Sequence, residues 1–512
     1  MSNQPIRVRR SGLITFAIKL GSTLTGFAFI VLVTSNLAPQ DFGLWQLISR
    51  VIGYVIFVLN IPYFWTTRYR ARGTKLGRTV MLECAILSVI FTLVYVFVSL
   101  GIAGTFPGGY ARNLHFLIVS APQVPLYIFS GVLEAILWGS SPEEASFGFG
   151  IFEIAKVVIG ALAVAVFHLG LTGAILAVTG AQVVQVLVAL FLTRHEYTDK
   201  ISTQLIWKMI KTGWVALLNL FGYFVSNFDF LIVAVLAGPT STVLVAMFAA
   251  ALVYTSVITY SNWIAFGLYA GILSGIDPKK SGNQVLELQY IFTAPMVVGE
   301  IVLAYPLLHI FKQNYVEAVP ILIVLTIASA LNAFSLTFDN IITGADKTDA
   351  AEKADMSLYL KSKLFVVAKI NITLAASYLA VLSVVTYFLA RQPSFSLFGY
   401  SQSVSIGILW AITSLGMWLI AVLLKVGYVR QLTALSIPRR SFGSIVAGSA
   451  LFGAVLYVLS KIITIHGGAV LQALYVLLMG GIGLGVYAAV LLSLNPQLRK
   501  LARTAIVSLV NP

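Results

Sequence analysis

The chain is a succession of about fourteen apolar segments, each long enough to cross a lipid bilayer as a helix. A segment inside the hydrocarbon region must satisfy its own backbone hydrogen bonds, and an α-helix does this within itself. We expect spans over residues 13–34, 44–65, 80–102, 114–138, 148–167, 169–192, 213–237, 242–270, 285–310, 316–343, 364–390, 404–424, 441–462 and 469–493. The segments therefore predict an all-α polytopic membrane protein.

The charge content agrees with a membrane location. Only 10% of the residues are charged and 59% are hydrophobic, whereas a soluble domain carries roughly 25% charged residues. The net charge is +15, but the basic residues occur in short clusters between apolar segments. Such clusters are typical of cytoplasmic loops and not of a nucleic-acid-binding surface. We expect a multi-pass protein of the cytoplasmic membrane, surrounded by membrane lipids, that binds no nucleic acid.

The distribution of the 33 lysines and arginines also predicts the topology. If the N-terminus is cytoplasmic, most of these residues fall in inside segments, including Lys425 after the span 404–424. Outside loops then hold only four of them: Arg112, Lys312, Arg391 and Lys461. A missed helix would reverse this bias downstream of itself. The bias therefore predicts an even number of spans and two cytoplasmic termini.

The inside segment 193–212 divides the predicted spans into two groups. We expect an N-terminal helical lobe over 1–192, an inter-lobe linker over 193–212, a second lobe over 213–390 and additional spans over 391–512. The ends of the first and seventh spans are alike, with short apolar runs at 29–33 and 230–234. Duplicated bundles of this kind occur in transporters with a central site. We expect two pseudo-symmetric bundles around a central cavity, in a monomer.

No pattern in the sequence supports a resident cofactor, a metal site or a catalytic nucleophile. The single cysteine, Cys84, excludes an internal disulfide and a cysteine-built metal site. The histidines match no metal-ligand spacing, and a GxxxxGK[ST] nucleotide-binding loop is missing. We therefore expect no cofactor, and a transporter driven by a gradient, the membrane potential or a partner. The alternative of a membrane enzyme would need catalytic acids in a loop, for which only Glu143–Glu144 is available.

Four cationic residues lie inside predicted spans: Lys19, Arg50, Lys156 and Lys369. A cation in hydrocarbon costs at least a few kcal/mol, so it normally faces a bundle interior or a water-filled cavity. A cationic cavity suits an anionic substrate. Lys19, Arg50 and Lys369 are also close enough to span ends to reach the headgroups instead. Lys156 follows Glu153 at i, i+3, so the two charges could neutralise each other.

Acidic residues within the spans form a second set. Asp229 and Glu300 lie too deep for short side chains to reach the interface. Each is either protonated, paired with a cation, or part of a site for Na⁺ or H⁺. Glu83, Glu134 and Asp339 lie closer to predicted cytoplasmic ends, so we expect them at the interface.

Four short stretches resemble a known family of transporters. The first is Gly21–Gln46, which contains the turn Leu37–Trp45 and matches the pattern L-x-P-x-x-F-G-x-[YW]. The others are His168–Ala177, Asn227–Asp229 and Ile342–Thr348. In order and position they are similar to the turns of the polysaccharide-biosynthesis flippases, which carry lipid-linked oligosaccharides. That family belongs to the multidrug/oligosaccharidyl-lipid/polysaccharide (MOP) exporter superfamily.

The resemblance implies two lobes around a V-shaped cavity, alternating access by rocking, and a lipid-pyrophosphate-linked sugar as cargo. It assigns pyrophosphate contact to the cations of spans one and two, here Lys19 and Arg50, with Lys156 as a further candidate. Two departures matter. Span eight has no cation, unlike the peptidoglycan-precursor flippases, and span one carries Lys19 where cation-coupled multidrug exporters carry an acid.

These observations favour a flippase that moves a lipid-(pyro)phosphate-linked oligosaccharide from the inner to the outer leaflet. Asp229 and Glu300, together with Glu153, would bind an ion or balance the cations. A cation-coupled multidrug exporter of the same superfamily is the first alternative. A membrane glycosyltransferase or polymerase is the second.

Overall fold

The computed structural model describes residues 21, 25–71, 73–211, 213–262, 278–345, 360–392, 394–432, 439–463, 467–495 and 499. Within these ranges the secondary structure is helical and contains no strand. Twelve of the described helices are long and apolar enough to cross a membrane, and two shorter apolar helices cover Thr25–Asn36 and Leu220–Leu236. The expected all-α polytopic architecture is confirmed, whereas the orientation and the exact count of spans stay predictions.

The chain forms two compact units, unit 1 over Met1–Ala246 and unit 2 over Met247–Pro512. The boundary falls within helix α12 (Ser241–Thr259). The expected linker 193–212 is therefore part of unit 1, and the division into lobes that the sequence suggests stays a prediction.

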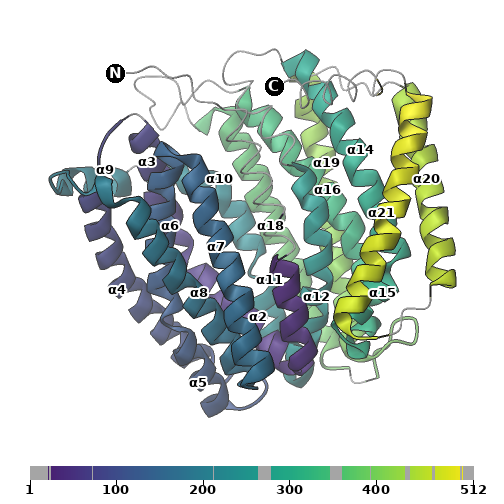
Figure 1. The fold of residues 1–512 in the computed structure, drawn as a ribbon, viewed down its shortest axis with the longest axis horizontal. Coiled ribbons are helices and arrows are strands. Elements are labelled where there is room, and N and C mark those ends of the chain that lie inside the picture. The colour runs from purple at the N-terminus through teal and green to yellow at the C-terminus, as the bar shows by residue number, and fades with distance from the viewer. Residues whose placement is uncertain are drawn as a thin grey trace. The chain divides into compact units, whose positions relative to one another are not determined.

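Unit 1 holds the helices that carry Arg50, Lys156 and Asp229. Its elements are α2 (Pro39–Val55), the 3₁₀-helix η1 (Ile56–Leu59), α3 (Asn60–Ala71), α4 (Gly77–Ile102), α5 (Tyr110–Ser120), α6 (Gln123–Ser140), α7 (Pro142–Gly160), a π-helical turn (Ala161–Val166), α8 (Gly170–Leu192), η3 (Arg194–Glu196), α9 (Thr203–Lys211), α10 (Gly213–Ser226), α11 (Asp229–Leu236) and η4 (Gly238–Thr240). Helix α6 packs against α3, α4, α7 and α8, and therefore lies at the centre of this unit (Figure 1).

Much of helix α2 is buried in unit 1. Phe42, Leu44, Leu47, Ile48 and Val51 are each at most 2% exposed. A Cβ atom at Gly43 would lie 1.9 Å from the backbone oxygen of Thr242, so only glycine permits this close approach. Burial on one side fixes the rotation of α2 about its axis and thereby the direction in which Arg50 projects.

The span that begins with α2 changes its helix type in the middle. Residues Ile56–Leu59 form a 3₁₀-helix between α2 and α3. Pro62 explains the break, because proline cannot donate to the carbonyl four residues earlier and its ring clashes with that carbonyl. A 3₁₀ stretch inside a longer helix often marks a functional hinge.

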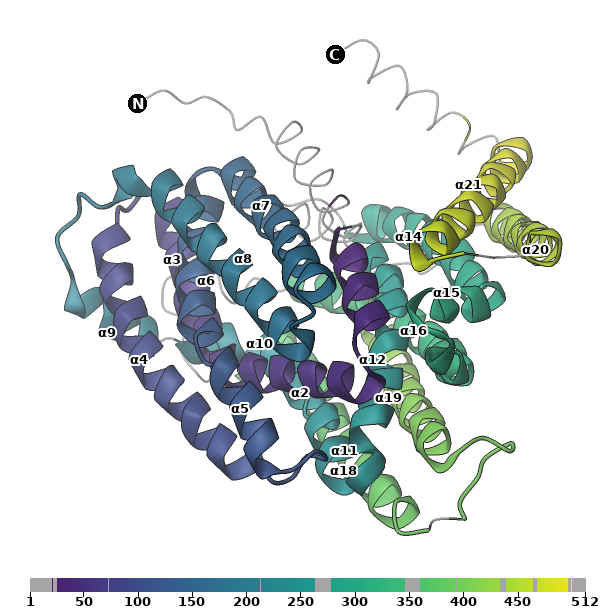
Figure 2. The same cartoon turned by 60° about the horizontal axis from the view of Figure 1, so that its bottom comes forward.

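Unit 2 contains the remaining long helices. They are α14 (Pro278–Val302), α15 (Ala304–Phe311), η6 (Gln313–Ala318), α16 (Val319–Gly344), α18 (Lys363–Leu389), α19 (Gln402–Leu432), α20 (Arg439–Ile462) and α21 (Ala469–Leu494), with η5 (Tyr260–Asn262) after α12. Helix α16 packs against α19 and α18, and α20 packs against α14 and α21. Helices α20 and α21 run side by side in Figure 2. Two apolar clusters fill these contacts, one around Phe338 and Ile341 and one around Phe452 and Met479.

Two sequence expectations about boundaries have different outcomes. The split between the fifth and sixth spans at 168–173 is confirmed, because the π-helical turn ends at Val166 and α8 begins at Gly170. The predicted end of the twelfth span at residue 424 is wrong, because α19 continues to Leu432. Lys425 was expected in an inside segment, but it lies within this helix and is 0% exposed. The helix continues through Lys425 because a buried partner, Asp339, allows a lysine to lie inside an otherwise apolar helix.

Candidate functional site

Arg50 lies on α2, where its guanidinium group meets the junction between α10 and α11. Nη1 of Arg50 donates a hydrogen bond to Oδ1 of Asn227 at 2.8 Å. The centre of the guanidinium lies 4.2 Å from the ring centroid of Phe230, which is within the range of a cation–π contact. One turn further along, the Tyr54 hydroxyl donates to the backbone oxygen of Asn227. These contacts hold the arginine in one orientation.

The guanidinium of Arg50 keeps donor groups that its described neighbours do not use. Among the residues that the structure describes, no carboxylate forms an ion pair with this guanidinium. Asn227 is exposed and Arg50 is half-buried, so the described protein does not enclose either side chain. Arg50 therefore has guanidinium N–H groups available to an anionic ligand.

Asp229 lies at the first position of α11, close to this arginine. Its Oδ1 accepts a hydrogen bond from the backbone N–H of Phe230 at 2.7 Å, and the residue is 9% exposed. Asp229 and Arg50 are both within electrostatic range of the Tyr54 hydroxyl. The structure therefore brings Arg50 and Asp229 to one corner of unit 1. The ion-binding or charge-balancing role of Asp229 stays a prediction.

Lys156 and Glu153 form the ion pair that their spacing predicts. Nζ of Lys156 lies 2.8 Å from Oε1 of Glu153 on α7, and both side chains are largely buried. The ammonium group also lies 5.4 Å from the ring centroid of Phe29 and 5.0 Å from that of Phe152. Pairing is confirmed, and it leaves Lys156 with less charge to offer a substrate than Arg50. Its role in substrate binding stays a prediction.

The other two cationic residues within predicted spans are Lys19 and Lys369. Lys19 lies outside the described residues, so its predicted role is not tested. Lys369 lies on α18 and is exposed, and within the described ranges it forms no ion pair. An exposed lysine on a spanning helix can reach the headgroup region through its long side chain.

Glu300 lies near the end of α14 in unit 2. Its Oε2 accepts a hydrogen bond from Oγ1 of Thr326 at 3.1 Å. No lysine, arginine or histidine of the described chain forms an ion pair with it. Of the three alternatives for this acid, pairing with a cation therefore finds no support here. A protonated carboxyl group and a site for Na⁺ or H⁺ stay predictions for Glu300.

A buried polar cluster in unit 2 was missed by the sequence reasoning. Nζ of Lys425 lies 2.7 Å from Oδ1 of Asp339 and donates to Ser335 Oγ at 2.7 Å. Nδ2 of Asn371 donates to Oδ2 of Asp339 at 3.2 Å. Asp339 was expected at the interface, but it is 9% exposed and packed between helices. The apolar residues Val426 and Val429, which continue the helical pattern beyond Lys425, were the signal that this lysine is internal.

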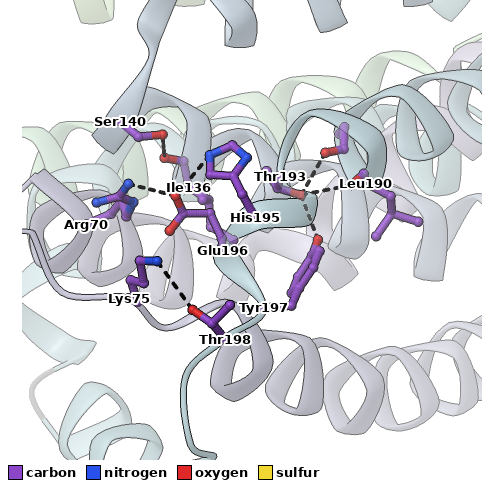
Figure 3. Close-up of polar contacts among 11 residues, drawn as sticks. Arg70, Lys75, Ile136, Ser140, Leu190, Thr193, His195, Glu196, Tyr197 and Thr198 are labelled. Carbon is purple, nitrogen blue, oxygen red and sulfur yellow. Dashed lines mark hydrogen bonds and ion pairs between the residues drawn. The ribbon is translucent and has the colours of Figure 1, made fainter.

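A second polar cluster connects the segment after α8 to α3 (Figure 3). Nη2 of Arg70 lies 2.7 Å from Oε1 of Glu196, whose side chain is only 2% exposed, and His195 approaches the same oxygen at 3.3 Å. Tyr197 shares a 2.6 Å hydrogen bond with Thr193. Burial raises the pKa of Tyr197 and the bond to Thr193 opposes that rise, so the hydroxyl is neutral near pH 7. The beginning of the expected linker is thus firmly attached to unit 1.

Comparison with protein-family models gives no match, and no curated protein matches the sequence. Solved structures do match. A lipid II flippase MurJ in an inward closed conformation matches with a TM-score of 0.62 and 13% identity, over 93% of this chain and 98% of that chain. An inward-facing multidrug resistance MATE family transporter of the MOP superfamily matches with a TM-score of 0.56 and 16% identity, over 82% and 98%. A MATE in complex with MaL6 matches with a TM-score of 0.51 and 16% identity, over 83% of this chain and 96% of that chain. The chain thus has the fold of the MOP superfamily, which confirms the expected resemblance at the level of fold.

Proposed function

We propose that this protein is a flippase that moves a lipid-(pyro)phosphate-linked oligosaccharide from the inner to the outer leaflet by alternating access. The observation that carries the proposal is the guanidinium of Arg50, oriented by Asn227 and Phe230 and without an ion pair among the described residues. An arginine within a spanning segment is costly, and such residues usually mark substrate or ion pathways.

The chemistry of arginine matches the proposed headgroup. A guanidinium binds phosphate oxygens through two parallel hydrogen bonds and remains charged at all physiological pH values. Asn227 occupies one N–H of Nη1, so the other N–H groups of Arg50 can contact a pyrophosphate. Lys19, in the preceding span, would supply the second cation, and Lys156 would act mainly through its pair with Glu153. Asp229 and Glu300 would bind H⁺ or Na⁺, or balance charge.

A cation-coupled multidrug exporter is the second candidate. Two observations favour it: the fold likeness to MATE transporters, and an acid within a spanning segment of each unit, Asp229, which is buried, and Glu300, which is half-buried. Arg50 argues against it, because a guanidinium that forms no ion pair within the described ranges repels the cationic compounds that such exporters would move. For the third possibility, a membrane enzyme, the candidate acids Glu143 and Glu144 lie in the first turn of α7 and not in a loop.

The proposal is tested in proteoliposomes that contain a polyprenyl-pyrophosphate-linked oligosaccharide in both leaflets. An externally added glycosyltransferase modifies only outward-facing lipid and thereby reports transfer between leaflets. The double variant Lys19→Gln, Arg50→Gln is expected to slow transfer at least about tenfold, which corresponds to about 1.4 kcal/mol. Lys369→Gln, which removes an exposed lysine of α18, is the matched control and should keep the wild-type rate.

If the double variant transferred the glycolipid at the wild-type rate, Lys19 and Arg50 would not bind the cargo. Efflux of ethidium from the same vesicles tests the second candidate. The multidrug exporter would be favoured if the wild-type protein exported ethidium but did not transfer the glycolipid. The variants Asp229→Asn and Glu300→Gln should then each lose the ethidium efflux.

A further inference from the structure

Helix α9 (Thr203–Lys211) is attached to unit 1 where two apolar spans end. It packs against α3, α4 and α10 and lies beside α4 in Figure 1. The backbone N–H of Ser202, directly before α9, donates a hydrogen bond to Oγ1 of Thr79 at 3.2 Å. Thr79 lies in the first turn of the span Gly77–Ile102, and the span Pro39–Thr67 ends in α3. The start of α9 therefore lies at the level where apolar helices meet the headgroups of a bilayer.

Two of the three sides of α9 are apolar, and one of these is exposed. Successive residues of an α-helix project about 100° apart, so nine residues cover every side. The first side is packed against the protein: Met209 is 0% exposed, and Leu205 and Ile206 are half-buried. On the second side Trp207 is 68% exposed and Ile210 is 49% exposed. No described part of unit 1 covers this second side.

The third side of α9 is polar and basic, with Gln204, Lys208 and Lys211 exposed. Lys211 follows Trp207 at i+4, so the basic side adjoins the exposed apolar side. A helix with an apolar side and a basic side is typical of helices that lie in the plane of a membrane surface. Tryptophan is enriched at this depth, because its ring is amphipathic.

The surroundings of α9 are also strongly basic. Residues 70–79 and 193–211 contain eight lysines and arginines but only two acids, Glu196 and Asp199. Both acids have partners inside the protein: Glu196 pairs with Arg70, and Asp199 accepts from the backbone N–H of Arg78 at 2.8 Å. The exposed cations here that form no ion pair among the described residues are Lys75, Arg78, Arg194, Lys200 and Lys211. The surface therefore attracts anions.

We infer that α9 and the cations beside it bind the headgroups of anionic phospholipids in the leaflet that surrounds this end of unit 1. Trp207 and Ile210 would enter the boundary between headgroups and acyl chains, and Lys208 and Lys211 would contact the phosphates. In the predicted topology this is the inner leaflet. The inference concerns resident lipids and does not depend on the cargo of the transporter.

A lipid surface fits these features better than a soluble acidic partner does. The exposed apolar side of α9 lies beside membrane spans, where acyl chains cover apolar side chains without any additional protein. The end of α8 repeats the combination of ring and cation: Phe191 is 63% exposed, and the guanidinium of Arg194 lies 4.1 Å from its ring centroid. Each lysine or arginine near an anionic membrane surface adds to the attraction.

The test measures lipid binding to the purified full-length protein by native mass spectrometry. Phosphatidylglycerol and phosphatidylcholine with the same acyl chains are titrated separately, because the first headgroup is anionic and the second is neutral overall. The double variant Lys208→Gln, Lys211→Gln removes two cations, and Trp207→Ala removes the exposed ring. The matched control is Lys369→Gln, Lys461→Gln, which removes two exposed lysines of α18 and α20.

We expect the wild-type protein and the control variant to bind phosphatidylglycerol at least about tenfold more tightly than phosphatidylcholine. The variant Lys208→Gln, Lys211→Gln should reduce this preference at least about fivefold. Trp207→Ala should weaken the binding of both lipids and keep the preference, because it removes apolar area and no charge.

Hydrogen exchange in lipid nanodiscs locates the bound lipid. Amides of residues 203–211 should exchange more slowly in nanodiscs that contain phosphatidylglycerol than in nanodiscs of phosphatidylcholine alone. This difference should disappear in Lys208→Gln, Lys211→Gln and persist in the control variant.

Several results would overturn the inference. One is equal affinity of the wild-type protein for both lipids, and another is a preference that the control variant loses and Lys208→Gln, Lys211→Gln keeps. If soluble glycerol phosphate slowed exchange in α9 as strongly as phosphatidylglycerol does, the surface would bind a free anion instead. If polyglutamate slowed it and phosphatidylglycerol did not, an acidic protein would be the partner. The glycolipid transfer assay is independent of these results, so the proposed function stands or fails separately.

Discussion

The ammonium group of Lys425 lies 2.7 Å from Oδ1 of Asp339, in the interior of unit 2, and thereby joins α19 to α16. Ser335 and Asn371 complete the cluster, and Asn371 adds α18 to it. The lysine side chain is fully inaccessible to solvent. Such a pair is only weak evidence for stability, but removal of one member leaves a charge without compensation.

The first prediction concerns this pair. Lys425→Met should destabilise the protein by about 3–5 kcal/mol, because the Asp339 carboxylate would remain buried without its cation. The measurement is thermal unfolding of the protein in detergent, monitored as the amount of protein that remains soluble after heating.

The double variant Lys425→Met, Asp339→Asn removes both charges and should recover most of the lost stability. Lys369→Met, at an exposed position of α18, should leave the melting temperature unchanged. A double variant that is as unstable as Lys425→Met would indicate that the lysine acts through packing and not through its charge.

The second prediction concerns Arg70 and Glu196, which attach the segment after α8 to α3. Arg70→Leu should loosen this segment, because the buried carboxylate would lose its main partner and retain only His195. Glu196→Gln keeps an oxygen for Arg70 to donate to and should have a smaller effect. Limited trypsin cleavage at Lys200, measured by mass spectrometry, should be faster in Arg70→Leu than in Glu196→Gln. Equal cleavage in both variants would contradict an electrostatic attachment.

The third prediction concerns the pair of Lys156 and Glu153 on α7. Lys156→Gln alone should destabilise unit 1 by on the order of 3 kcal/mol, since Glu153 is left in a largely buried site. The double variant Lys156→Gln, Glu153→Gln should regain most of this stability. If the pair only stabilises the fold, the double variant should also transfer the glycolipid at more than about half of the wild-type rate. Loss of transfer in a stable double variant would give Lys156 a direct role in binding.

Much of the fold could be predicted from the sequence, because membrane spans leave a strong signal. The breaks at Pro62 and at His168–Gly170 follow from local chemistry, and the i, i+3 spacing was sufficient to predict the pair of Lys156 and Glu153. These features depend on residues that are close in the chain.

Contacts between distant residues could not be predicted in the same way. Asn227 meets Arg50 across 177 positions, and Lys425 meets Asp339 across 86. A charged residue in an apolar run predicts the end of a span unless its partner is known. For this reason the sequence predicts that Lys425 lies outside the span 404–424, although it lies within α19. The sequence indicated that Asn227 and Asp229 form a motif, but only the packing of α2 against α11 shows that Asn227 orients Arg50.

The last prediction uses this contact to test the proposed function by changing a single charge. Asn227→Asp is nearly isosteric and places a carboxylate 2.8 Å from Nη1 of Arg50. The new ion pair would neutralise the guanidinium and compete with a phosphate, so affinity for a polyprenyl pyrophosphate should fall at least about tenfold.

The fold should survive this change. The variant loses the hydrogen bond from Asn227 Nδ2 to the backbone oxygen of Tyr223, worth about 1 kcal/mol, and gains the pair with Arg50. Asn227→Ala is the control: it loses the orienting contact but adds no charge, so its affinity should fall less than that of Asn227→Asp. Binding is measured by titration of the purified proteins, and melting temperatures verify that both are folded. If Asn227→Asp bound the pyrophosphate like the wild-type protein, Arg50 would not be the anion site, whereas gain of ethidium transport by this variant would favour the exporter.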